Sequence, residues 1–247
     1  MTTLTFPDPH GYADLVTLVR RALRADPEAA VRLHATGHLL RAWVAVLPGT
    51  GLFGAGAALG VRGLELAEPA GHTGEVDVVC AAAALADRFA RDGVGATRLS
   101  VPPATVYAAW SGSLPAHQGW VAAGQLDALD LQAIARAGIE QIATATRANT
   151  SAGPAQVGAR AVAELRSQVW GRPIPAPAAL DPASLDPAGL DPAGLDPAVP
   201  DGVVPAGAAF AAYVLGFLPT AGGVVRVLRN GAWVRLSTQA GDVLSRP

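Results

Sequence analysis

Near its C-terminal end the chain reads VVRVLRNGAWVRLS over residues 224–237. Apolar residues alternate with polar ones on both sides of Asn230-Gly231, a pair that is typical of two-residue β-hairpin turns. The stretch therefore predicts two antiparallel strands, from Val224 to Arg229 and from Ala232 to Ser237. A further alternation from Val243 to Ser245 predicts a third strand, so the chain is expected to end in a small antiparallel sheet with one apolar face.

The same turn predicts a register. With Asn230-Gly231 as the loop, Arg226 lies directly opposite Arg235, and like charges in this position are destabilising unless an anion neutralises them. Arginine suits bidentate carboxylate or phosphate contacts, and tryptophan suits stacking. We therefore predict that Arg226, Trp233 and Arg235 bind an anionic ligand or an acidic partner. The alternative is that solvent, or an internal carboxylate such as Asp242, screens the two cations.

Four copies of the pentad Leu-Asp-Pro-Ala-x run from Leu180 to Val199. A proline in every pentad cannot continue a helix, and one leucine per pentad gives little apolar surface to bury. We predict an α+β body at 1–172, a linker at 173–204 and a C-terminal piece at 205–247. That piece is too short to fold alone, so it is expected to unfold together with the body. The aspartates of the pentads are further candidate partners for the two arginines.

Upstream of the pentads, strand-like alternation and helical spacing are both present. Short connections between the strand-like segments favour an antiparallel meander. We expect an α+β fold in which an antiparallel sheet built from residues 30–80 is covered by helices, with the C-terminal hairpin or meander packed back on this body. Residues 208–218 fit either a helix or a strand, and the spacing favours a helix. The expected strands are 31–35, 39–47, 59–67 and 76–80, and the expected helices are 12–25, 82–92, 127–146 and 154–170.

The composition limits the function. Hydrophobic residues make up 51% and charged residues 15% of the 247 residues, which is typical of a globular chain. The net charge of −2 argues against a dedicated nucleic-acid binder. All 18 basic residues are arginines, as is typical of a GC-rich bacterial genome. The lack of lysine excludes enzymes with a Schiff-base lysine, P-loop enzymes and protein kinases.

The ends and the apolar runs favour a cytoplasmic protein that makes no membrane contact. Residues 1–12 have neither the charged nor the apolar region of a signal peptide. The longest apolar run, 206–218, is too short to span a bilayer. Cys80 is the single cysteine, so an intrachain disulfide framework is excluded and a reducing compartment fits.

Residues 49–54 satisfy the glycine pattern G-x-G-x-x-G. A dinucleotide-binding site needs a full helix directly after these glycines and an acidic residue at the end of the next strand. Here small residues and another extended segment follow, so the sequence predicts a glycine-rich hairpin loop. We expect neither a nucleotide nor any other cofactor.

His34 and His38 have a spacing that binds metal when both lie on one helix face. Thr36-Gly37 between two strand-like runs predicts a turn, so the two histidines are expected to flank a hairpin, without a metal. Cys80 ends a strand on the side of Val76 and Val78 and is expected to be buried. A nucleophilic role would need His72 or His117 close to it in space.

Trp110, His117 and Trp120 surround a loop of glycine, serine and proline at 111–116. Such residues can form the wall of a ligand pocket, and the alternative is that the tryptophans fix a long loop to the core. A G-x-S-x-G motif is absent from the sequence, so a serine hydrolase of that type is not indicated.

These observations predict a non-catalytic cytosolic binding or interaction protein. Its partner would be an unidentified protein or a small anionic ligand at Arg226, Trp233 and Arg235. The alternative is an enzyme that acts on a small anionic substrate in a pocket near Trp110, His117 and Trp120. The scarcity of a convincing general base or nucleophile favours binding.

Overall fold

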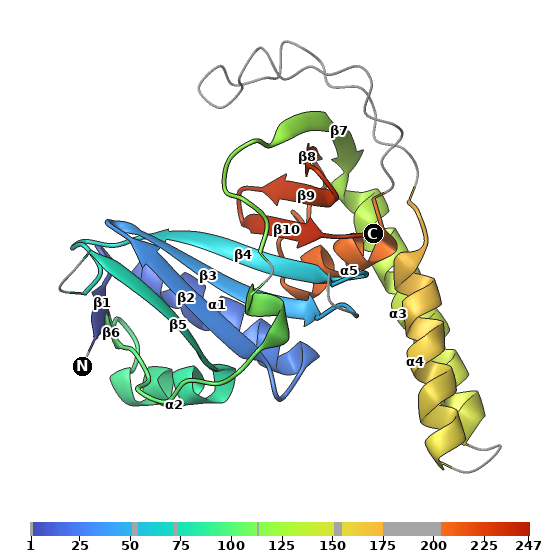
Figure 1. The fold of residues 1–247 in the computed structure, drawn as a ribbon, viewed down its shortest axis with the longest axis horizontal. Coiled ribbons are helices and arrows are strands. Elements are labelled where there is room, and N and C mark those ends of the chain that lie inside the picture. The colour runs from blue at the N-terminus through green and yellow to red at the C-terminus, as the bar shows by residue number, and fades with distance from the viewer. Residues whose placement is uncertain (1, 51–53, 72–73, 113, 151–154, 175–203) are drawn as a thin grey trace. The chain divides into compact units, whose positions relative to one another are not determined.

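The structure, a computed structural model, describes residues 2–50, 54–71, 74–112, 114–150, 155–174 and 204–247 (Figure 1). The chain divides into two compact units. The first comprises Met1–Pro48 and Leu59–Leu114, and the second Gly49–Ala58 and Pro115–Pro247. Each unit is described here by itself.

This division does not test the predicted domain boundaries at 172 and 205. The pentads from Leu180 to Val199 lie outside the described residues, as do the predicted linker positions 175–203. The second prediction, that residues 205–247 unfold together with the body, concerns stability and stays a prediction.

In the first unit, strands β5, β2, β3 and β4 lie side by side in that order, and β2 is antiparallel to both β3 and β5. Strands β1 and β6 form a separate antiparallel pair. The predicted strands and the turn at Gly37 are thus confirmed. The elements of this unit are β1 (Thr3–Thr5), α1 (Pro9–Ala25), β2 (Ala30–Thr36), β3 (Leu39–Leu47), β4 (Ala58–Glu65), β5 (Glu75–Ala81), α2 (Ala82–Asp92), β6 (Arg98–Ser100) and a 3-10 helix (Ala109–Gly112).

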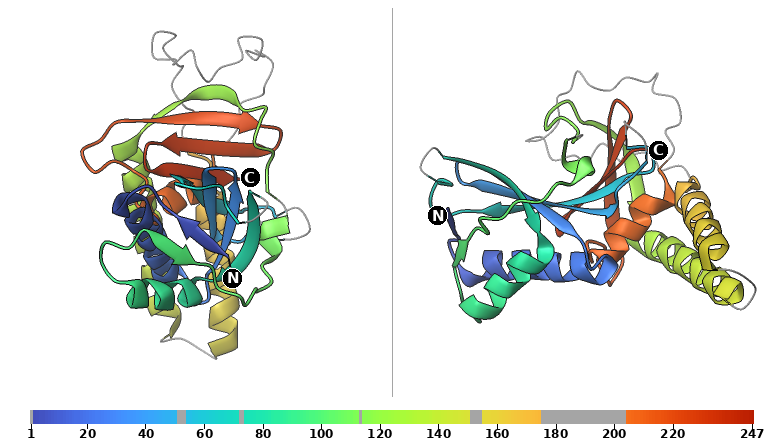
Figure 2. Two further views of the ribbon diagram at one scale, coloured as in Figure 1. Left: turned by 90° about the vertical axis from the view of Figure 1, so that its left-hand side faces the viewer. Right: turned by 60° about the horizontal axis from the view of Figure 1, so that its bottom comes forward.

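Helix α1 covers one side of this sheet. Its first turn is capped by Asp8, whose carboxylate accepts hydrogen bonds from the backbone N–H groups of His10 at 2.8 Å and Gly11 at 3.2 Å. The helix packs against β3 and α2, and both helices lie on the same side of the strands (Figure 2). The apolar core of the unit includes Leu15, Leu18, Val19, Val31, Leu33 and Ala35.

On the other side of the sheet, Arg32 of β2 forms hydrogen bonds to β5 and to the segment that contains Ser111. Its Nε and Nη2 donate to the two carboxylate oxygens of Asp77 on β5 at 2.7 and 2.6 Å, and its Nη1 donates to the carbonyl of Ser111 at 2.6 Å. The hydrogen bonds from Arg32 lower the pKa of the Asp77 carboxyl from its ordinary value. The N–H of Val106 donates to the carbonyl of Val79 at 3.0 Å, so the chain after β6 is fixed along β5.

In the second unit, strands β10, β9, β8 and β7 lie side by side in that order and pair antiparallel, which confirms the predicted C-terminal sheet. Residues 206–214 form a helix, as the spacing favoured, and strand β7 was not predicted. The elements of this unit are β7 (Val121–Asp127), α3 (Ala128–Thr150), α4 (Ala155–Gly171), α5 (Ala206–Val214), β8 (Val224–Asn230), β9 (Trp233–Thr238) and β10 (Gly241–Ser245).

The long helices α3 and α4 belong to this second unit, where α3 packs against α4, α5 and β7. Our prediction that they cover the sheet of residues 30–80 concerns the two units relative to one another, so it stays a prediction. Both helices pack against α5, which follows the pentads in sequence. Asp127 caps α3 as predicted, because its carboxylate accepts from the N–H groups of Leu129 at 2.7 Å and Asp130 at 3.3 Å.

Gly138 allows α3, α4 and α5 to approach closely. A Cβ atom at this position would lie 2.3 Å from Cζ3 and 2.6 Å from Cη2 of Trp170. Trp170 is 6% exposed, and its ring stacks on that of Phe210 in α5 at a centroid distance of 4.3 Å. The indole of α4 therefore packs against both α3 and α5.

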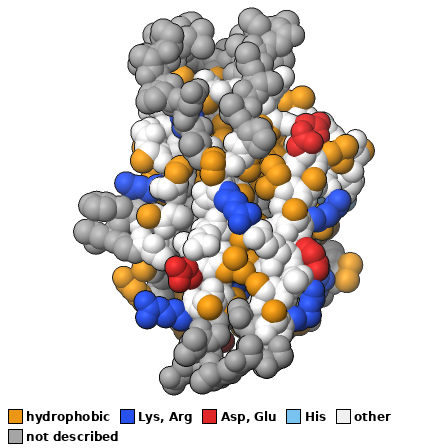
Figure 3. Space-filling view, turned by 90° about the vertical axis from the view of Figure 1, so that its right-hand side faces the viewer, with side chains coloured by type: hydrophobic (Ala, Val, Ile, Leu, Met, Phe, Trp, Pro, Cys, Tyr) orange, Lys and Arg blue, Asp and Glu red, His pale blue; other side chains and the backbone are white. Residues whose placement is uncertain are grey.

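The side of the molecule that bears α3 and α4 is mixed in character. Apolar side chains are scattered there among arginines and acidic residues (Figure 3). None of the helices in the described parts of the chain is both long and apolar enough to cross a membrane.

We expect Gly138→Ala to destabilise the protein. The added methyl group would have to displace the Trp170 ring, and such overpacking costs about 1–3 kcal/mol, only partly offset by the roughly 1 kcal/mol gain in helix propensity. The matched control is Gly171→Ala at the end of α4, where a Cβ would meet nothing within 4 Å. Denaturant unfolding should show a loss of stability for Gly138→Ala and none for Gly171→Ala. Equal stability of the two variants would contradict this account.

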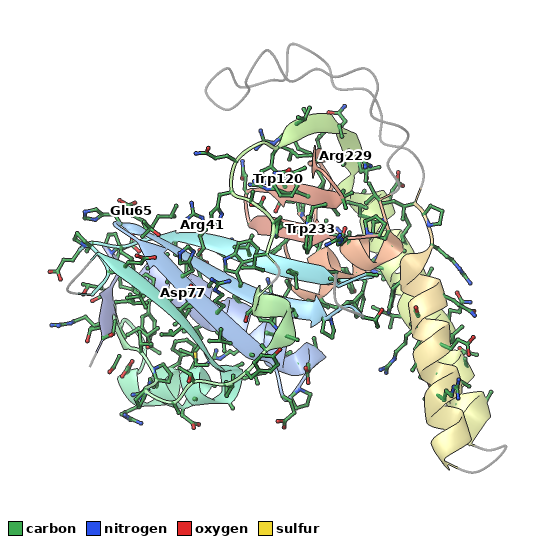
Figure 4. The ribbon with its side chains drawn as sticks, in the orientation of Figure 1. Arg41, Glu65, Asp77, Trp120, Arg229 and Trp233 are labelled. Atoms are coloured by element: carbon green, nitrogen blue, oxygen red, sulfur yellow. The ribbon has the colours of Figure 1, made fainter. Side chains whose placement is uncertain are left out.

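We expect Asp77→Asn to lower the stability of the protein near neutral pH and to have no effect on its stability in acid. The pKa of the Asp77 carboxyl lies below its ordinary value of 3.8, so its contribution is present above that pH and is lost as the pH falls through the lowered pKa. The Asp77 side chain is 40% exposed, which limits the effect to about 1 kcal/mol or less. Unfolding measured between about pH 2 and 6 tests this. The control is Glu65→Gln, an exposed acid of the same unit (Figure 4), and a pH-independent deficit for Asp77→Asn would exclude the explanation.

Candidate functional site

The hairpin β8–β9 has a different register from the predicted one. Arg226 pairs with Ser237, and Arg235 pairs with Leu228, so the prediction that Arg226 lies directly opposite Arg235 was wrong. The pairing has moved by two positions, and every side chain keeps the face predicted for it. The two arginines are therefore diagonal neighbours on one face, a geometry with less repulsion than a direct pair.

The physical reason for the shift lies in the turn. An Asn-Gly turn of type I′ needs positive φ at both central residues, and in the described residues only glycines have positive φ. The turn is instead Gly231-Ala232, with Gly231 at φ 54° in the first central position, as in type II′ turns. Asn230 is thereby released to pair with Trp233, and its side-chain amide donates to the carbonyl of Gln118 at 2.7 Å.

This register builds a row of polar side chains across all strands of the second unit. Gln125 on β7 pairs with Arg226 on β8, Arg226 with Ser237 on β9, and Ser237 with Asp242 on β10. We call the side of the sheet that bears this row the arginine face. The opposite side bears the buried residues Val225, Val227, Val234, Leu236 and Val243.

Arg235 is held by an internal carboxylate. Its Nη2 lies 2.6 Å from Oδ2 of Asp242, and the hydroxyl of Ser237 donates to Oδ1 of the same group at 2.6 Å. Asp242 is thus the internal partner that the sequence analysis named as an alternative. The two side chains are 29% and 20% exposed, so the pair is partly shielded from water.

Trp120 lies against the same arginine. The Arg235 guanidinium carbon is 5.8 Å from the centroid of the Trp120 ring, a cation–π distance. The indole N–H donates to the carbonyl of Ala116 at 3.0 Å, which fixes the ring (Figure 4). Trp120 and Arg235 were predicted for two different sites, and the fold of the second unit brings them together.

Arg226 differs from Arg235 in having no partner among the described residues. Its side chain is exposed, and no described carboxylate or carbonyl lies within ion-pair or hydrogen-bond distance. Gln125, directly opposite it, is half-buried, and its side-chain amide also makes no hydrogen bond in the described part of the chain. On β8 the neighbours of Arg226 on this face are Val224, which is 62% exposed, and the half-buried Leu228.

Trp233 lies on the arginine face and is half-buried (Figure 4). Arg229 projects to the opposite side of β8, where burial lowers the pKa of its guanidinium group. It is therefore not part of the arginine face. The residues that sequence reasoning missed are Gln125 and Ser237. Strand β7 was not predicted because alanine and glycine, which are poor strand formers, occupy much of it.

The second predicted site involves both units. Trp110 lies in the 3-10 helix of the first unit and is half-buried, whereas His117 and Trp120 belong to the second unit. Because the units are described separately, a pocket formed by these residues stays a prediction. So does the alternative of an enzyme that acts there.

The other candidate residues have structural surroundings. His38 ends the turn after β2, and its Nδ1 lies 2.9 Å from the carbonyl of Leu66. His34 lies on β2 between Asp77 and Arg41 of the neighbouring strands. No group of three or more potential metal ligands occurs in the described residues.

Cys80 is buried on the apolar side of the sheet, as predicted, with its Sγ 3.7 Å from the carbonyl of Val31. Burial raises the pKa of its thiol to about 11, so the thiol is neutral at physiological pH. The glycine loop at 49–54 joins strands β3 and β4, as a hairpin loop does, although residues 51–53 lie outside the described part.

Comparison with known families gave two matches, each to a separate part of the chain. Residues 1–112 match a family described as Domain of unknown function (DUF8010), and residues 115–247 match one described as Domain of unknown function (DUF8185). The change from one match to the other coincides with the division between the two units at Leu114 and Pro115. A search of curated proteins gave no match.

Among solved structures, the chain is similar to the crystal structure of a DNA polymerase sliding clamp from Pseudomonas aeruginosa with ligand, at 13% identity and a TM-score of 0.44. The alignment covers 100% of this chain and 64% of that chain, so this protein spans less than two thirds of the length of the clamp. The match to residues 115–247 covers more than half of the 247 residues. The chain therefore belongs to the family Domain of unknown function (DUF8185).

Proposed function

We propose that this chain is a cytosolic binding protein that recognises an anionic group on a small ligand or a protein partner through its arginine face. The observation that supports this is the state of Arg226. It is an exposed guanidinium without an ion-pair partner in the described residues, set between Gln125 and Ser237 in an ordered sheet. A strand holds its backbone rigidly, so the cation is presented in a defined direction.

The two arginines of this face differ in how far they are available to an external anion. Arg235 forms an ion pair with Asp242, whereas Arg226 has no carboxylate partner in the described residues. A carboxylate or phosphate can accept two parallel hydrogen bonds from one guanidinium, which gives geometric specificity. Exposed ion pairs contribute only about 0–1 kcal/mol, so binding through Arg226 alone is weak and decreases with salt. Trp233 and Trp120 add flat apolar surface beside the charges.

We expect Arg226→Ala to weaken the binding of an anionic probe. Labelled poly-glutamate serves as the probe, and fluorescence anisotropy gives its affinity at about 0.01 M salt, where the Debye length is about 30 Å. The matched control is Arg166→Ala, which removes an exposed arginine from α4. Loss of this exposed ion-pair contact should weaken binding about three- to fivefold in Arg226→Ala only. If both variants bound poly-glutamate equally weakly, the probe would be attracted by the overall charge of the protein, and a binding site at Arg226 would be excluded.

We expect Asp242→Asn to strengthen anion binding. The substitution removes the internal carboxylate from Arg235 and leaves a side chain of similar shape that still accepts from Ser237. The freed guanidinium then adds a second cation, and the gain should be up to about fivefold, the scale of one exposed ion pair. The double variant Asp242→Asn/Arg226→Ala separates the two arginines. Unchanged affinity in Asp242→Asn would remove Arg235 from the proposed site.

A further inference from the structure

Strand β8 presents a repeating pattern on the arginine face. Val224, Arg226 and Leu228 alternate with residues of the opposite side and so project from the same face. Val224 is 62% exposed, Arg226 is exposed, and Leu228 is half-buried. Residues two apart on a strand are about 6.6–6.8 Å apart, so the three side chains form a strip with an apolar group on each side of a cation.

The strip is longer than a single carboxylate or phosphate group. An anion of that size would reach Arg226 and would leave Val224 and Leu228 in water. A peptide in extended conformation has the same two-residue spacing, so an acidic side chain at one position places the side chains two residues before and after it over the two apolar positions. Such a ligand meets both the charge and the apolar surface of the strip.

We infer that the arginine face takes an extended acidic peptide segment of a protein partner, with the pattern apolar-x-acidic-x-apolar along β8. The inference rests on the proposed function. The acidic carboxylate pairs with Arg226, and the amide of Gln125 can donate to its second oxygen because that amide has no other partner in the described residues. Ser237 takes no part, since its hydroxyl donates to Asp242.

Three fluorescein-labelled peptides test the inference on the full-length chain. The first is Ile-Thr-Glu-Thr-Ile, the second replaces Glu by Gln, and the third replaces both Ile residues by Ser. All three carry blocked ends, and inorganic phosphate is used as a competitor. We expect the first peptide to bind about fivefold more tightly than either of the others, since it alone makes both the charged and the apolar contacts.

Variants of the strip identify where the peptide binds. Val224→Ser should weaken the Ile-flanked peptide about threefold and leave the Ser-flanked peptide unchanged, because only the former covers this position. The exposure of Val224 makes a folding defect of this variant easy to exclude by thermal unfolding. Leu228→Ser gives a second measurement, and Arg226→Ala should weaken both glutamate peptides. Arg166→Ala on α4 remains the control.

Two failures are distinguishable. If the two glutamate peptides bind equally, compete with phosphate and are both lost in Arg226→Ala, the arginine face binds anions without reading a peptide, and the inference is wrong while the proposed function stands. If neither the peptides nor phosphate bind, or if Arg226→Ala changes nothing, the proposed function fails and the inference fails with it.

Discussion

The positive φ of Gly231 determines the arrangement of the arginine face. Because the first central residue of the hairpin turn has a left-handed conformation, glycine occupies it, and the turn is Gly231-Ala232. This choice pairs Asn230 with Trp233 and Arg226 with Ser237. The polar row across β7 to β10, the diagonal position of the two arginines and the hydrogen bond from Asn230 to Gln118 all follow from it.

Three arginines of this protein show how the same side chain takes different roles. Arg32 makes three hydrogen bonds to Asp77 and Ser111 and fixes the chain after β6 to the sheet. Arg235 is neutralised by Asp242 and covers the Trp120 ring. Each of these two has its charge satisfied within its own unit. Arg226 is exposed and has no such partner in the described residues, which makes it the arginine of the three that is available to an external anion.

The two compact units meet near residue 114, where one family match ends and the other begins. In sequence the pentads lie between α4 and α5, and both of these helices belong to the second unit. The reason is that α3 and α4 share their core with α5, which follows the pentads. Trp170 and Phe210 stack across this gap in the sequence, so the two sides of the pentads belong to one unit.

The sequence by itself determined the local structure. Period-two alternation identified β2, β3, β5, β8 and β9, helical spacing identified α1 to α5, and the aspartate at 127 marked the start of α3. The faces of Arg226, Trp233, Arg235 and Cys80 were also correct. These properties depend on neighbours within a few residues, and a register shift of two positions leaves them unchanged.

The tertiary structure alone decided which groups meet. The register of β8 and β9 depends on backbone dihedral angles that the pair Asn230-Gly231 does not fix, because glycine can serve in either turn position. The contact of Trp120 with Arg235 and the unit to which α3 and α4 belong depend on packing between distant segments. Alternation in the sequence shows whether a side chain faces water or the core. It does not show which residue lies next to that side chain on the neighbouring strand, and this neighbour decides whether an arginine of the site is paired with a carboxylate.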